Sequence, residues 1–150
     1  MSQRVQYFDS SSDVHPPFRC GEAGVVWLSE EGFLETDTRV SIDPNAYHSL
    51  FAHGVVDALA RLPLDLGPLC EGGEAVFAPP SMSEALRIFY EADRETYGVR
   101  HDLLVARAWG SPPIDYRIEV DNREYQRTLS QLQFLASQAA RMGQGLRLRL

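Results

Sequence analysis

The chain has 150 residues with a formal net charge of −7, of which 44% are hydrophobic and 23% are charged. This composition is typical of one globular domain, 1–150, and excludes a disordered, collagen-like or membrane-spanning chain. All 14 basic residues are Arg, which excludes chemistry that depends on Lys, such as Schiff-base formation or a P-loop.

The acidic balance disfavours nucleic acid as a partner. Residues 1–12 contain no apolar run of signal-peptide length, and no segment resembles a membrane helix. We therefore expect a cytoplasmic protein without membrane contact. Cys20 and Cys70 are expected to be free thiols, because two cysteines do not form a disulfide scaffold.

The N-terminal third predicts three strands, at Arg4–Phe8, Val25–Leu28 and Phe33–Ile42. The last two flank a Ser-Glu-Glu-Gly turn at 29–32, in which Gly suits a positive φ, so we expect a hairpin. In the arm that follows the turn, Leu, Thr, Val and Ile alternate with charged or polar residues. This period of two predicts one buried face and one exposed face.

Three segments carry apolar residues at helical spacing, and we expect helices over 44–62, 82–97 and 122–142. The first begins with an N-cap residue before Pro, at Asp43–Pro44. The other two begin with capping-box patterns, in which Glu follows three residues after Ser81 and Asp121. Gly54 weakens the middle of the first helix, and Pro63 ends it. Gly98 and Gly143 are suited to the left-handed position after the other two.

Further strands are expected at Ala75–Ala78, Leu103–Trp109, Ile114–Val120 and Leu146–Leu150, with 64–74 as a loop. From residue 75 onward the order is β-α-β-β-α-β, which is that of a split βαβ or ferredoxin-like unit. The expected fold class is therefore α+β, an antiparallel or mixed sheet with three main helices on one face.

No motif assembles a catalytic or metal site. His15, His48, His53 and His101 lack the spacing of metal ligands, and no CxxC or HExxH pattern is present. A thiol nucleophile at Cys20 or Cys70 lacks any local signature. No catalytic residue, cofactor or metal is predicted.

Acidic residues that lie close together in the sequence, and the aromatic residues, have ordinary explanations as well. The pairs Glu30/Glu31, Glu35/Asp37 and Asp93/Glu95 are most simply explained as solvated surface. Trp27 and Trp109 lie on predicted strands and are expected in the core.

Charge is distributed unevenly along the chain. Residues 1–75 hold 4 Arg and 12 acids, a net charge of −8, whereas residues 76–150 hold 10 Arg and 9 acids, a net charge of +1. Glu30, Glu31, Glu35 and Asp37 fall on the turn and the exposed face of the first hairpin. Such a surface steers basic partners, although an acidic face also serves solubility.

Two hypotheses follow. In the first, the chain is a non-catalytic acidic binding module, an inhibitor or immunity-type protein that binds a basic protein through Glu30, Glu31, Glu35 and Asp37. In the second, it is a small enzyme or ligand-binding domain with a pocket between the sheet and its helices, in which Cys70 and His101 are candidate groups. The absence of an assembled catalytic set favours the first.

Overall fold

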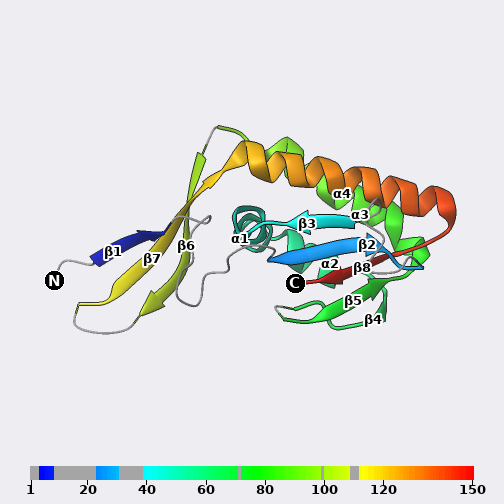
Figure 1. Cartoon of the computed structure of the whole chain (residues 1–150), viewed down its shortest axis with the longest axis horizontal. Helices are drawn as coiled ribbons and strands as arrows, with labels where there is room; N and C mark the ends of the chain where they lie inside the picture. Colours follow the sequence, from blue (N-terminus) through cyan, green and yellow to red (C-terminus); the bar gives the residue numbers. More distant parts are fainter. Residues whose placement is uncertain (1–3, 9–22, 31–38, 71, 99, 109–111) are drawn as a thin grey trace.

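The computed structural model describes residues 4–8, 23–30, 39–70, 72–98, 100–108 and 112–150. They form two sheets and four α-helices, which confirms the α+β class. Figure 1 shows the larger sheet under the two long helices, with the smaller sheet set apart at one end of the molecule.

The larger sheet has five antiparallel strands in the order β3-β2-β8-β5-β4. Their bounds are Gly24–Leu28 for β2, Arg39–Ile42 for β3, Leu64–Leu66 for β4, Glu74–Phe77 for β5 and Leu146–Arg149 for β8. The predicted alternation holds at β8, where Leu146 and Leu148 are buried and Arg149 is exposed. Strand β4 was not expected, because 64–74 had been predicted to be a loop.

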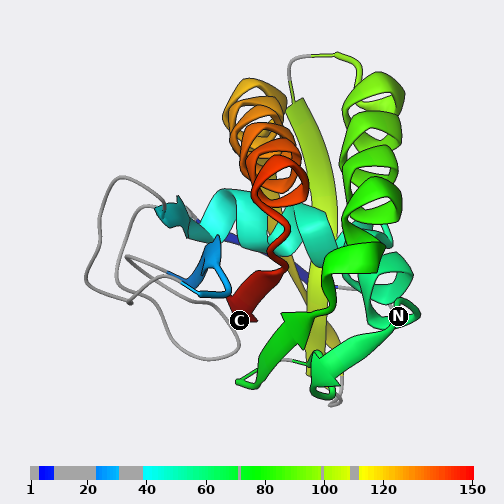
Figure 2. The ribbon, with the colours of Figure 1, turned by 90° about the vertical axis from the view of Figure 1, so that its right-hand side faces the viewer.

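The helices cover one face of this sheet and enclose a single core with it. They are α1 (Pro44–Ala52), α2 (Val55–Ala60), α3 (Met82–Glu95) and α4 (Asn122–Met142), with a short 3-10 turn η2 (Pro79–Ser81) before α3. Figure 2 shows α3 and α4 side by side. Fully buried side chains from helices and sheet meet between them, among them Phe89, Tyr125, Leu129, Phe77 and Leu146.

The first predicted helix is two helices. Gly54 takes a left-handed φ of 76° and separates α1 from α2, a conformation that Gly adopts without steric cost. The Asp43 cap is confirmed, since its carboxylate accepts a 2.7 Å hydrogen bond from Ala46 N–H. The three helices expected from the sequence therefore correspond to four in the structure.

The other two helices match their predicted starts more closely than their predicted ends. Gly143 is the left-handed residue that ends α4, at φ 68°. Helix α3 ends at Glu95, two residues before the predicted end, and Thr96 is extended. The Ser81 hydroxyl makes no cap bond; it donates instead to the Pro63 carbonyl at 3.1 Å.

The smaller sheet has the order β1-β7-β6, with β1 at Arg4–Phe8, β6 at Arg100–Ala108 and β7 at Ile114–Asp121. The order β-α-β-β-α-β from β5 to β8 is as predicted. However, β5 and β8 lie in one sheet and β6 and β7 in the other, so a ferredoxin-like unit is not confirmed. No helix in the described ranges has both the length and the apolar character to span a membrane.

Candidate functional site

A network of hydrogen bonds surrounds the junction between β7 and α4. Asn45 of α1 exchanges two hydrogen bonds with the Asp121 backbone, at 2.8 and 3.0 Å. Buried Asn122 donates to the carbonyls of Tyr97 and Gly98, and Gln126 donates to the carbonyl of Thr96. The first turns of α4 therefore hold the chain immediately after α3.

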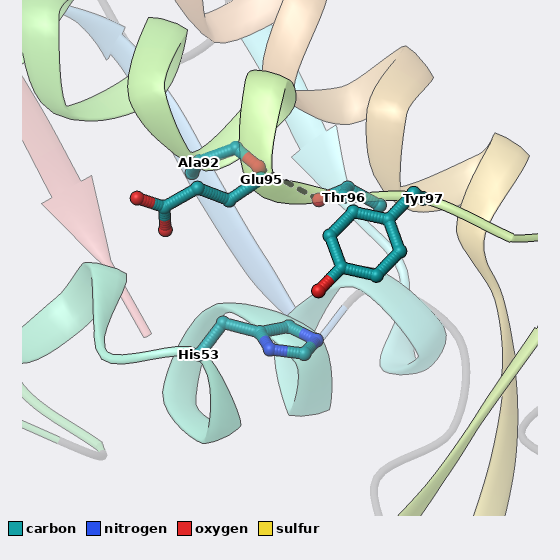
Figure 3. A pocket seen from close by; sticks show the side chains of 5 residues that line it. All are labelled: His53, Ala92, Glu95, Thr96 and Tyr97. Atoms are coloured by element: carbon teal, nitrogen blue, oxygen red, sulfur yellow. Dashed lines mark hydrogen bonds between the residues drawn. The ribbon is translucent and has the colours of Figure 1, made fainter.

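A pocket of about 310 Å³ opens where α1 and α3 both end. We name it the α1–α3 pocket, lined by His53, Ala92, Glu95, Thr96 and Tyr97. Figure 3 shows the Tyr97 ring above the His53 imidazole, with the Tyr97 hydroxyl directed toward it. The Thr96 hydroxyl donates to the Ala92 carbonyl at 2.7 Å and closes the last turn of α3.

Glu95 lies at a position of α3 that is electrostatically unfavourable for a negative charge. It lies in the last turn of α3, where the negative end of the helix dipole disfavours a carboxylate. Within the described part of the chain its carboxylate has no ion pair or hydrogen bond, and neighbouring Arg94 instead lies over the Tyr90 ring. An exposed carboxylate at such a position is available to a cation from outside.

Tyr125 supports the pocket from the core. Its ring stacks on His53, with centroids 5.4 Å apart and planes 16° apart. The Tyr125 hydroxyl is buried, and no described protein group hydrogen-bonds to it. Burial, together with the negative charges of Asp93 and Glu95, holds the pKa of this phenol well above its usual range.

A second pocket of about 360 Å³ lies between α4 and the edge strand β3. It is largely apolar and is bordered by the exposed ring of Phe134. Its other lining residues are Arg39, Val40, Arg127, Ser130, Gln131, Leu135 and Gln138. None of these described lining residues is a His, Cys or acid, so they supply no acid–base pair for catalysis.

Of the predicted acidic face, only Glu30 is described; Glu31, Glu35 and Asp37 lie outside the described residues. Glu30 is exposed and directly follows β2. Its backbone N–H donates to the Gln144 amide oxygen at 3.2 Å, and Ser29 exchanges hydrogen bonds with Gly145. The start of the turn is therefore anchored to the α4–β8 connection.

Two groups of described carboxylates differ in pairing. Six residues of the C-terminal half, here called the paired carboxylates, form ion pairs with Arg: Glu84, Glu91, Asp102, Glu119, Asp121 and Glu124. Glu30, Asp57 and Asp65 of the N-terminal half, here called the unpaired carboxylates, have no ion pair within the described ranges, and in the C-terminal half Asp93 and Glu95 have none either. In the N-terminal half Glu74 does pair with Arg147 and Arg149, and Asp43 caps α1.

The remaining candidates are dispersed. His48 is buried, His53 and Cys70 are exposed, and the His101 side chain lies outside the described residues, as do His15, Cys20 and Trp109. Neither pocket is lined by Cys70. No three His, Cys, Asp or Glu side chains in the described ranges gather as metal ligands do. Trp27 is buried, as expected.

The sequence does not predict the α1–α3 pocket. It presents His53 only as a possible metal ligand, Glu95 as solvated surface, and Tyr97 as the last residue of the expected helix over 82–97. Tyr97 is in fact 77% exposed, because α3 ends before it. The available signal was the pair of acids in the last helical turn, a position that favours bases.

No protein-family model, curated protein or solved structure matches the chain. Its function is therefore inferred from its own residues and geometry.

Proposed function

We propose that the chain is a non-catalytic acidic binding module whose partner is a basic protein, in the manner of an inhibitor or immunity-type protein. Glu30, Glu31, Glu35 and Asp37 form its contact face. The observation that carries this proposal is the difference in pairing: the paired carboxylates neutralise the Arg residues around them, whereas Glu30, Asp57 and Asp65 do not.

Pairing concentrates the negative field. Carboxylates next to guanidinium groups contribute little net potential at a distance, and exposed charges beyond about 8–10 Å are screened by salt. Residues 1–75 carry a net charge of −8, and among their described acids Glu30, Asp57 and Asp65 have no Arg partner that would offset their charge. A one-sided negative surface increases the association rate of a basic protein.

Ser29 and Glu30, at the start of this face, are fixed to the sheet. Three hydrogen bonds join 29–30 to 144–145. A binding surface on a fixed element loses less conformational entropy on association than one on a free loop.

The alternative, a small-molecule-binding domain, is favoured by the pocket between α4 and β3. Its volume of about 360 Å³ falls within the range of small-molecule sites. Its lining is largely apolar and would suit a small molecule with an apolar body.

The test is capture from a lysate of the source cells at low and high salt, with mass spectrometry of the bound proteins. The baits are the wild type, E30Q/E31Q/E35Q/D37N, and a control, E84Q/E91Q/E119Q/E124Q, that loses the same four charges from the paired carboxylates. We expect a basic protein to be captured by the wild type and the control at low salt, and not by the first variant. Equal capture by all three baits, or equal loss from both variants, would contradict the proposal.

A further inference from the structure

The α1–α3 pocket combines three features that attract a cation. It lies at the C-terminal ends of two helices, where the dipoles place partial negative charge. It is lined by Glu95, whose carboxylate no described residue neutralises. It is also lined by the aromatic side chains of Tyr97 and His53, and the face of a Tyr ring attracts cations.

The shape of the pocket favours a planar cation over a compact one. Tyr97 and His53 present flat rings on one side, and Glu95 lines the pocket from α3 (Figure 3). A guanidinium group stacks on aromatic faces and binds a carboxylate through two parallel hydrogen bonds, whereas an ammonium group does neither. The buried Tyr125 hydroxyl, next to His53, is a further polar group without a described partner.

The pocket also carries a local cost that folding does not explain. A carboxylate in the last turn of α3 opposes the helix dipole, and no described Arg offsets it. Asn122 donates a hydrogen bond to the Tyr97 carbonyl and so fixes the backbone there, yet the Tyr97 side chain is largely exposed. Local rules of this kind are typically broken at functional sites.

We infer that the α1–α3 pocket receives the guanidinium group of an arginine side chain presented by the basic partner. This inference rests on the proposed function and adds to it a second contact, separate from Glu30, Glu31, Glu35 and Asp37. The Glu95 carboxylate accepts from the guanidinium N–H groups, and the Tyr97 ring stacks on the guanidinium plane.

The test uses Nα-acetyl-arginine methylamide as the probe, titrated into the full chain and followed by amide correlation NMR. The neutral isostere Nα-acetyl-citrulline methylamide is the ligand control. We expect saturable shifts at Gly54, Thr96 and Tyr97 with the arginine probe and not with the citrulline probe. E95Q should weaken binding about tenfold, and Y97A about threefold.

Two further measurements separate a binding role from a structural one. D65N, which removes an unpaired carboxylate from β4, should leave probe affinity unchanged. E95Q should melt at the same temperature as the wild type or slightly higher, because it removes a charge that opposes the dipole of α3. Equal affinity for both probes, an unsaturable response, or equal effects of E95Q and D65N would overturn the inference.

The outcomes also distinguish the two proposals. If the arginine probe fails to bind while E30Q/E31Q/E35Q/D37N still abolishes capture of a basic protein, the pocket inference fails and the proposed function stands. If the probe binds through Glu95 while no basic protein is captured, the pocket stands as an arginine site and the proposed function fails.

Discussion

The described carboxylates in the two halves of the chain differ in how often they form ion pairs with Arg. In residues 76–150 most described acids lie beside an Arg, as in the bridge of Arg87 to both Glu84 and Glu91 on α3. In residues 1–75 the described acids Glu30, Asp57 and Asp65 do not. These exposed pairs contribute only about 0–1 kcal/mol each to stability, so their main effect is to lower the net negative potential around the six paired carboxylates.

The exception, Glu74, connects the halves. Its carboxylate on β5 accepts from Arg147 at 2.8 Å and from Arg149 at 3.5 Å, both on the neighbouring strand β8. Arg149 also lies over the ring of buried Trp27 on β2. Glu74 is therefore paired at a place where side chains of β5, β8 and β2 meet. Glu74 therefore contributes to the stability of the sheet, whereas Glu30, Asp57 and Asp65 have no ion pair among the described residues.

The largest expected effect comes from G145A, which separates β8 from β5 and strains the bonds by which residue 145 holds Ser29 of the other half. A methyl group at Gly145 would overlap the Phe77 carbonyl, a backbone group that cannot rotate away. β8 would have to move from β5, and the bonds between 145 and Ser29 would be strained. We expect a loss of about 3 kcal/mol in the free energy of unfolding, the upper range for overpacking, measured by urea denaturation. S130A on the exposed face of α4 is the control and should change little.

E74Q tests the one pair that joins the halves and should cost about 1 kcal/mol, the upper end for an exposed pair. The hydrogen bond from Arg147, with the charges of Arg147 and Arg149, holds the pKa of Glu74 below its ordinary value of 4.5. Its contribution is therefore complete above pH 4.5 and is lost as the pH falls through the lower folded value. The stability difference between wild type and E74Q should be full at pH 7 and should shrink below about pH 4. A difference that does not vary with pH would contradict this assignment.

The smallest expected effect on stability comes from E30Q/D65N, which removes two unpaired carboxylates. This variant should change the free energy of unfolding by less than about 0.5 kcal/mol, with a slight gain in stability because repulsion between acids is relieved. Thermal melting at low salt measures this, with E74Q in the same series. A loss as large as that of E74Q would mean that these carboxylates have partners, and the two halves would not differ as described.

Much of the fold could be predicted because its signals are local. Asp43 before Pro44, and Gly143 after a long apolar stripe, mark helix ends by short-range chemistry that the structure confirms. Alternating Leu and Arg in 146–149 likewise identify β8 and its buried face. The break at Gly54 was visible as a weak point, but whether Gly bends or merely weakens a helix depends on what the two segments pack against.

The sheet arrangement and the α1–α3 pocket could not be predicted in this way. Strand order alone does not determine that β6 and β7 leave the sheet that contains β5 and β8. The pocket joins His53 to residues about forty positions later, and it exists only because Asn122 and Gln126 hold the end of α3. The acidic face was predicted from charge and alternation, and of its four residues only Glu30 is described, exposed as expected.

The central claim is that the acids of the first hairpin, and not net charge alone, attract the partner. The most direct measurement is the association rate constant for the captured basic protein as a function of ionic strength. Wild type, E30Q/E31Q/E35Q/D37N and the equally charged control E84Q/E91Q/E119Q/E124Q are compared. We predict that the first variant associates about tenfold more slowly at low salt, with a flatter salt dependence, while the control keeps the wild-type slope. Equal slopes for the two variants would contradict the account.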